Sequence, residues 1–296
     1  MSYFHDCFHI LSGYQIDTIY DFHVQAFSRN IGILTSEEQA KLAEAKVAIP
    51  GMGGVGGVHL ITLVRSGLGR FHLADFDSFE PVNVNRQFGA KITTLGRSKL
   101  NVMTEEALSI NPYLNITAFP RGVEADNIHQ YLAGVDVVLD GLDFFAFETR
   151  RLLFKTARKK GIPVITAGPL GFGSAMLIFH PSMGMGFDEY FDIHDDLNEE
   201  EKHLHFALGL APKTLQFKYM DTSKVSLKAQ SGPSTAIACQ LSSVLACTEC
   251  LRIILRKEGC KPVPYYLQFD PYIQKLKKGY LWKGNKNPFQ IVKKVI

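Results

Sequence analysis

Four glycines follow a short apolar run, and their spacing is typical of a loop that binds phosphate. Gly51, Gly53 and Gly56 occupy the glycine positions of G-x-G-x-x-G, and Gly54 lies between them. Glycine lets phosphate approach the backbone N–H groups at a helix start, where a Cβ would obstruct it. Asp75 ends the next apolar run. It follows by about 20 residues, which suits a carboxylate that binds a ribose hydroxyl.

The polar residues after Asp75 have the chemistry needed for nucleotidyl transfer. They are Asp77, Asn83, Arg86, Gln87 and Lys99, with Asp143 after a later apolar run. Arg and Lys can neutralise a triphosphate and the charge that develops when its α-phosphorus is attacked. A carboxylate at a strand end can hold Mg2+, which bridges phosphate oxygens. A dehydrogenase has no need of this set, so the sequence favours ATP as the nucleotide.

The elements that position these residues alternate along the chain. Strands are expected at 46–50, 70–75, 115–119, 135–140 and 163–167, and helices at about 36–45, 54–66, 97–110, 126–132 and 144–160. A capping box at Ser36-Glu-Glu-Gln39 is expected to open the first helix. This order predicts an α/β fold, with a Rossmann-like, mainly parallel sheet and helices on both faces. Ligand is expected at the carboxyl ends of the strands.

The alternation stops near residue 180. We expect an N-terminal extension at 1–30, an ATP-binding core at 31–180, and a solvated cap or mobile crossing loop at 181–230. Residues 231–296 should complete the same domain with a long apolar helix that starts at 231–233, with Pro233 near its first turn, and mixed or antiparallel strands at 265–269 and 280–282. Residues 164–179, which glycines interrupt, predict two strands and a turn. Residues 236–255 could span a bilayer by length, but Gln240, Glu249 and Arg252 favour a buried core helix.

Composition is that of an ordinary globular protein. The 296 residues are 46% hydrophobic and 21% charged, and a net charge of +3 is too small to indicate nucleic acid or an anionic membrane. Five cysteines and no signal-peptide pattern predict reduced thiols in the cytoplasm. Cys247 and Cys250 form a lone C-x-x-C in an apolar run. We interpret them as buried side chains, because structural zinc usually needs two such pairs.

Two further clusters favour a structural reading over a functional one. His194, His203 and His205 lie among acidic residues, but helix positions i and i+2 do not face each other. They therefore indicate a polar segment rather than a metal site. The Phe residues at 144, 145 and 147 are expected to pack the start of a helix.

In chain order the motifs read G-x-G-G-x-G, D-x-D, N-x-x-R-Q, a lysine and D-x-x-D. This combination resembles the ThiF/MoeB/HesA adenylyltransferases, which are relatives of the ubiquitin-activating enzymes, over roughly residues 28–167. The resemblance implies an ATP-dependent adenylyltransferase that converts a carboxylate into an acyl-AMP and releases pyrophosphate. The carboxylate would be the C-terminal glycine of a ubiquitin-like or sulfur-carrier protein, such as a small protein ending in Gly-Gly, or a small-molecule or peptide acid.

The resemblance also implies roles for single residues. Asp75 would bind the ribose, and Lys99 would contact phosphates. Asn83, Arg86 and Gln87 would hold the triphosphate and the reacting carboxylate, and Asp143 would bind Mg2+. Arg29, within Ser28-Arg-Asn30, would reach into the neighbouring subunit's site in a homodimer.

Departures from the family and alternatives to it remain. No cysteine lies between Cys7 and Cys239, so no internal thioester is expected, and no structural zinc is expected either. The chain could instead resemble the tRNA threonylcarbamoyladenosine dehydratases, although its modest charge argues weakly against tRNA. A nucleotide-binding module without catalysis and an NAD-dependent oxidoreductase are further alternatives. The sequence leaves the acyl substrate and the final nucleophile open.

Overall fold

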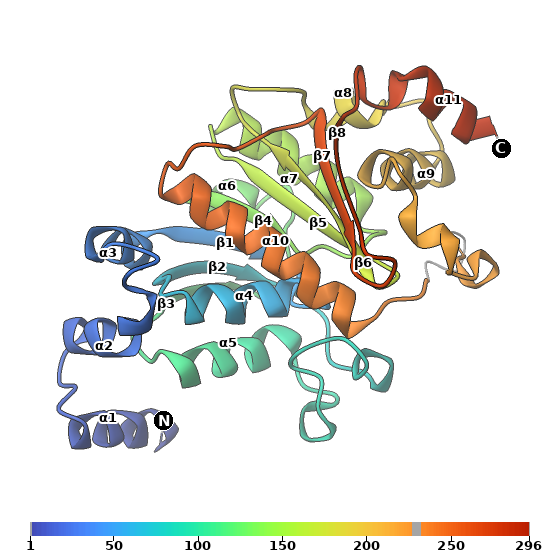
Figure 1. The fold of residues 1–296 in the computed structure, drawn as a ribbon. Helices are drawn as coiled ribbons and strands as arrows, with labels where there is room; N and C mark the ends of the chain where they lie inside the picture. The colour runs from blue at the N-terminus through green and yellow to red at the C-terminus, as the bar shows by residue number, and fades with distance from the viewer. Residues whose placement is uncertain (1, 227–231, 296) are drawn as a thin grey trace.

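One mixed sheet of eight strands forms the centre of the molecule. The computed structural model describes residues 2–226 and 232–295 (Figure 1). The strand order is β3-β2-β1-β4-β5-β6-β7-β8. Strands β1 to β5 pair in parallel, and β6, β7 and β8 pair antiparallel at one end of the sheet. The predicted α/β class, with a mainly parallel sheet and antiparallel C-terminal strands, is therefore confirmed.

The strands agree closely with the sequence prediction, except at the C-terminus. They are β1 Lys46–Pro50, β2 Arg70–Ala74, β3 Asn115–Phe119, β4 Val137–Asp140, β5 Val164–Leu170, β6 Gly173–Phe179, β7 Tyr265–Asp270 and β8 Lys275–Tyr280. The prediction of a last strand at 280–282 was wrong. That strand starts at Lys275, because residues 271–274 form a tight connection and β8 pairs along the whole of β7.

Helices cover both faces of the sheet, as predicted. The α-helices are α1 Ser2–Gly13, α2 Ile19–Ala26, α3 Ser36–Glu44, α4 Gly56–Arg65, α5 Lys99–Ile110, α6 Ile128–Tyr131, α7 Phe147–Lys159, α8 Phe187–Phe191, α9 Glu199–Leu210, α10 Ala236–Ile254 and α11 Pro288–Val295. The 3-10 turns are η1 Ser28–Asn30, η2 Pro81–Asn83, η3 Ile92–Thr94, η4 Leu215–Lys218, η5 Thr222–Lys224 and η6 Gly284–Lys286. Buried residues of α3, α4, α5 and α10 form the core on one face, and those of α6, α7, α8 and α9 form the core on the other.

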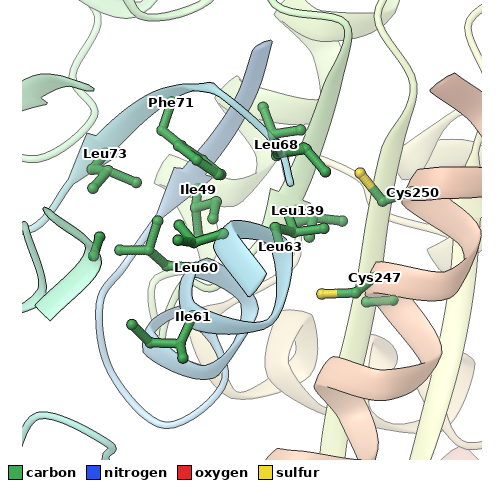
Figure 2. Close-up of a cluster of buried hydrophobic side chains, with 14 of the residues drawn as sticks. Ile49, Leu60, Ile61, Leu63, Leu68, Phe71, Leu73, Leu139, Cys247 and Cys250 are labelled. Carbon is green, nitrogen blue, oxygen red and sulfur yellow. The ribbon is translucent and has the colours of Figure 1, made fainter. Parts of the chain in front are cut away.

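Successive side chains of each strand point to opposite faces of the sheet, which produces these two cores. Val47 and Ile49 of β1 face the α4 side, while Ala48 between them faces the α7 side. Figure 2 shows Ile49 among Leu60 and Leu63 of α4. Cys247 and Cys250 of α10 are buried in the same cluster (Figure 2). Burial raises the pKa of both thiols, and their interpretation as buried side chains is confirmed.

Helix α10 lies across the sheet beside α4 (Figure 1). It is long and apolar enough to span a membrane, but it packs on β4, β5 and β6, as its polar interruptions predicted. Thr235 caps it by accepting a hydrogen bond from the Ala238 N–H, so the helix starts at Ala236 rather than at the predicted 231–233. Pro233 lies just before the cap, near the first turn. The cap of α3 is likewise Thr35 rather than Ser36, with Glu38 completing the capping box.

The segment at 181–230 differs from the solvated cap or mobile loop that its composition suggested. In its described part, Phe187, Tyr190 and Phe191 of α8 and Phe206 of α9 are buried. They form ring contacts with one another and with Phe179 of β6. Most of the acidic residues are exposed or lie at helix starts, so the acidic composition did not reveal the buried aromatic core.

The histidine and phenylalanine clusters belong to the same packing. His203 is buried against Phe144, Phe145 and Phe147, which confirms that these aromatics pack the start of α7. His205 is also buried, and its Nδ1 lies 2.8 Å from the Asp192 carbonyl oxygen. These two histidines of the predicted polar segment are therefore buried rather than exposed.

Candidate nucleotide site at the carboxyl edge of the sheet

The glycine loop forms where three backbone segments meet without side chains between them. Gly51 has a φ of +88°, and a Cβ there would lie 2.2 Å from the Gly141 carbonyl oxygen. A Cβ on Gly56 would lie 1.7 Å from the Gly51 carbonyl oxygen. Gly141, which directly follows β4, is equally confined, because its Cβ would lie 2.8 Å from the Pro50 carbonyl oxygen. Gly141 was not predicted as a site residue, although its place after an apolar strand was a signal.

Asp75 ties this loop to the end of β2. Its Oδ2 accepts a 2.6 Å hydrogen bond from the Met52 N–H, and its Oδ1 accepts a 2.8 Å bond from the Asp77 N–H. Burial raises the pKa of Asp75, while these two N–H groups and Lys99 oppose the shift. Each carboxylate oxygen can accept more than one hydrogen bond, so Asp75 keeps capacity for a ribose hydroxyl.

Lys99 lies at the start of α5 and is buried. Its Nζ forms a 3.0 Å ion pair with Asp77 Oδ2, and its backbone N–H donates to the Asp77 carbonyl oxygen at 2.9 Å. Asp77, whose N–H binds Asp75, therefore holds the ammonium near the carboxylate that is bonded to the glycine loop. A triphosphate at the loop would compete with the Asp77 carboxylate for the lysine.

The segment from Asn83 to Gln87 forms one side of the site. Asn83 is buried, and its Oδ1 accepts from the Glu80 N–H at 3.0 Å. Gln87 is buried next to Gly53, where a Cβ would lie 3.6 Å from Gln87 Nε2. Gln87 Oε1 is buried and has no hydrogen-bond partner within residues 2–226 and 232–295. A buried acceptor without a partner is costly, so Gln87 fits a ligand group that donates a hydrogen bond.

Arg86 runs along the glycine loop. A Cβ on Gly54 would lie 3.9 Å from Arg86 Cγ. Arg86 Nη1 donates to the Val82 carbonyl oxygen and to Asn85 Oδ1, both at 3.0 Å. These acceptors orient the guanidinium and leave its other N–H groups for an anion.

The start of α10 closes another side of the site, which no local sequence signal predicted. Asn85 Nδ2 donates to the Ser234 carbonyl oxygen at 3.0 Å. A Cβ on Gly54 would lie 2.9 Å from Cys239 Sγ. Cys239 is buried, and burial raises the pKa of its thiol against the opposing effects of Ser234 and Arg86.

A buried ion pair shapes the loop that contains Asp143. Arg150 Nε donates to Asp140 Oδ2 at 2.9 Å, and Arg150 also donates to the carbonyl oxygens of Leu142, Asp143 and Phe144. Asp143 itself is exposed, and its Oδ1 accepts from the Phe145 N–H. Arg150 was not predicted, because nothing in its helical sequence context distinguishes it from a surface arginine.

Arg29 does not join the glycine loop of its own chain. It is exposed in η1. The adjacent Asn30 bonds to Gln39, which donates to the Ser66 carbonyl oxygen at the C-terminal end of α4. Helix α4 has 10 residues, so this end lies about 15 Å from its start at the loop.

The structure thus brings the glycines, Asp75, Asp77, Asn83, Arg86, Gln87 and Lys99 to one edge of the sheet. Glycine backbone, two cations and polar side chains at a helix start form an anion-binding arrangement. The Asp143 loop joins this edge through Gly141, whose backbone contacts the glycine loop.

Comparison with known proteins identifies the family. The ThiF family model matches residues 27–287 of this chain. The chain belongs to the ThiF family.

Curated relatives in sequence include two enzymes with different names. The tRNA threonylcarbamoyladenosine dehydratase of Bacillus subtilis is 34% identical over 142 residues, covering 48% of this chain and 55% of that protein. The sulfur carrier protein ThiS adenylyltransferase of Escherichia coli is 29% identical over 188 residues, covering 63% of this chain and 73% of that protein. The chain spans about half the length of the dehydratases it matches.

Solved structures show the same fold. Escherichia coli MccB, crystallised with ATP, superposes with a TM-score of 0.65 at 19% identity, covering 88% of this chain and 72% of MccB. The ThiF-family match includes Arg29, the glycine loop and the whole of α10.

Proposed function

We propose that this ThiF-family protein is an ATP-dependent adenylyltransferase that activates a carboxylate as an acyl-AMP and releases pyrophosphate. One observation carries the proposal: Arg86 and Gln87 lie against the glycine loop, and Asp77 holds Lys99 next to the Asp75 carboxylate that binds this loop. Gln87 Oε1 has no partner among the described residues. The site supplies positive charge and open hydrogen-bonding groups at a helix start. That combination suits a triphosphate rather than an apolar ligand.

In the proposed reaction, a carboxylate oxygen attacks the α-phosphorus of ATP, and the bond to the bridging oxygen of pyrophosphate breaks. The carboxylate is ionised at pH 7, so the step needs no general base. Arg86 and Lys99 would neutralise the charge that develops on the phosphate oxygens. Asp75 would accept a hydrogen bond from a ribose hydroxyl. Positioning and charge neutralisation supply the catalysis.

The residues of the site suit Mg2+ bound by one protein carboxylate, that of Asp143. Mg2+ in nucleotide sites is usually held by one or two carboxylates and by substrate phosphates. In the described residues, no group of three or more His, Cys, Asp or Glu could hold an ion by itself. Asp143, which is exposed beside the site edge, would be the protein ligand, and bound Mg2+ would neutralise phosphate charge.

Exchange of labelled pyrophosphate into ATP, with candidate carboxylates added, tests the proposal. Arg86→Ala and Asp143→Ala should each lower the exchange rate about 100-fold or more. Arg97→Ala is the matched control, because Arg97 pairs with Glu105 on the surface and should leave the rate unchanged. Undiminished exchange in the Arg86→Ala protein would refute the assignment. NAD binding without ATP binding would favour an oxidoreductase instead.

We also propose that the enzyme acts as a homodimer in which Arg29 completes the partner's site. Two features support this: Arg29 is remote from its own loop, and α10, which meets that loop at Cys239, exposes apolar side chains. Ile237 and Val244 are 55% and 56% exposed. Mixing Arg29→Ala with Asp75→Ala protein should restore one site in each mixed dimer. If the mixture stays as inactive as the separate variants, Arg29 does not act in trans.

The dehydratase relatives favour one alternative substrate, a carboxylate on modified tRNA. Their similarity to this chain covers only about half of their length. Exchange assays with threonylcarbamoyladenosine-containing tRNA, a Gly-Gly-ending carrier protein and small peptides would separate these substrate classes. The class that stimulates exchange identifies the acyl donor.

A further inference from the structure

A second cavity lies away from the nucleotide site, between α10 and the antiparallel end of the sheet. Its volume is about 500 Å3, within the range of small-molecule sites. It is lined by Ile178 near the end of β6, Tyr265 at the start of β7 and Tyr280 at the end of β8. The strand pairing places these positions at the sheet edge opposite the glycine loop. We call this cavity the β7–β8 groove.

The groove has an apolar floor and an aromatic wall. Met176 and Ile178 of β6 and Leu267 of β7 form the floor. Tyr265 and Tyr280 form the wall, with their ring centroids 4.8 Å apart and their planes at 73°. Both tyrosines are exposed, so a flat ring could lie against them with little rearrangement.

Positive charge exceeds negative charge in this groove. Four charged residues line it: Glu249, Arg252, Lys261 and Lys278. Arg252 Nε lies 3.1 Å from Glu249 Oε2, so these two neutralise each other. Lys261 Nζ lies 5.6 Å from the Tyr265 ring centroid. Among the described residues, neither Lys261 nor Lys278 has an acidic partner within 4.0 Å.

We propose that the β7–β8 groove binds a small aromatic anion, with its ring against Tyr265 and Tyr280 and its acidic group at Lys261 and Lys278. The two lysines supply uncompensated charge beside an apolar, aromatic surface, which matches a ligand that is flat at one end and anionic at the other. An extended anion without an apolar body would leave the floor exposed. The site is separate from the nucleotide site, so the proposal does not depend on the adenylation reaction.

Strand geometry supplies a matched control for this site. Lys278 is opposite Leu267 and lines the groove. Lys277 is opposite Gln268, which bonds to the Lys213 N–H on the other side of the sheet. Successive side chains of a strand point to opposite faces. Lys277→Glu and Lys278→Glu therefore change the net charge equally, and only the second alters the groove.

The test uses 8-anilinonaphthalene-1-sulfonate, an aromatic anion whose fluorescence rises on binding, with the 296-residue chain. We expect saturable binding that Lys278→Glu and Tyr280→Ala each weaken about tenfold or more, and that Lys277→Glu leaves within about twofold. Thermal denaturation confirms that each variant is folded, and Lys278→Gln replaces Lys278→Glu if the latter unfolds. Pyrophosphate exchange should be unchanged in Lys278→Glu, which separates this proposal from the proposed function.

Two results would overturn the proposal. The first is equal affinity for the probe in the wild-type protein and in the folded Lys278 variant. The second is equally tight binding of N-phenyl-1-naphthylamine, the uncharged analogue, because the groove would then be an apolar surface without selectivity for anions.

Discussion

Removing Arg150 should destabilise the protein strongly. The side chains of Arg150 and Asp140 are 3% and 1% exposed, and the ion pair between them is 2.9 Å long. Arg150→Ala would leave a buried carboxylate without its cation and would remove donors from three carbonyl oxygens. Breaking a buried ion pair from one side costs about 3–5 kcal/mol. That is a large part of the roughly 5–15 kcal/mol that stabilises a typical domain.

Urea denaturation at pH 7, at fixed protein concentration, measures this cost. Arg97→Ala is the control, because the Arg97–Glu105 pair is 46% and 60% exposed and should contribute less than about 1 kcal/mol. The double variant Asp140→Asn/Arg150→Met removes the orphaned charge and keeps an acceptor for the Leu142 N–H. It should be more stable than Arg150→Ala by about 1–3 kcal/mol.

Two results would contradict this prediction: a cost of Arg150→Ala no greater than that of Arg97→Ala, or a double variant as unstable as Arg150→Ala. The first result would mean that water replaces the guanidinium without penalty. The second would mean that the cost arises from lost packing rather than from the unpaired carboxylate. Pyrophosphate exchange by Arg150→Ala should also fall, because three of its hydrogen bonds hold the Asp143 loop.

Three further predictions follow from the glycine loop and its surroundings. Gly56→Ala should abolish ATP binding, because the new Cβ would lie 1.7 Å from the Gly51 carbonyl oxygen. Gly57→Ala is the control, because its Cβ would have no contact closer than 3.4 Å, and it should bind ATP normally in calorimetry. Normal ATP binding by both variants would contradict the steric explanation. Burial lowers the pKa of His59 from 6.5 to about 3. Between these pH values the unfolded chain binds a proton at His59 and the folded chain does not, so the free energy of unfolding should fall by about 1.4 kcal/mol per pH unit as the pH drops from 6.5 toward 3. Urea denaturation at several pH values should show a weaker dependence of this free energy on pH in His59→Leu, and an unchanged dependence would assign the acid sensitivity to other groups. Asp77→Asn should release Lys99 from its 3.0 Å ion pair and lower the KM for ATP, while Lys99→Ala should raise it; a raised KM in Asp77→Asn would mean that the carboxylate positions the lysine instead of competing with ATP.

Much of the parallel core could be predicted from local sequence. The predicted ends of β1 and β3 match the structure, and those of the other parallel strands and their helices differ by a few residues. These elements were predictable because apolar periodicity, glycines and caps act over a few residues of chain. The glycine loop, Asp75 and the segment from Asn83 to Gln87 also lie together as predicted, since the carboxyl ends of parallel strands share one edge.

The errors concern regions where composition and folding disagree. Acidic residues at 181–230 suggested solvent exposure, but Phe187, Tyr190 and Phe206 are buried beneath them. Pro233 suggested a helix start, but Thr235 offered a side-chain cap two residues later. In both cases the local sequence signal predicted the structure less well than the few residues that make specific contacts.

The sequence by itself determined which backbone could approach a phosphate, where the parallel strands run, and the ThiF-like order of polar residues. Only the tertiary structure decided that Cys239 touches Gly54, that Arg150 holds the loop of Asp143, and that Arg29 lies remote from its own glycine loop. The reason is physical: local patterns depend on neighbours within a turn or a strand. Contacts between distant segments depend on how the whole sheet and its helices pack, which no local spacing encodes.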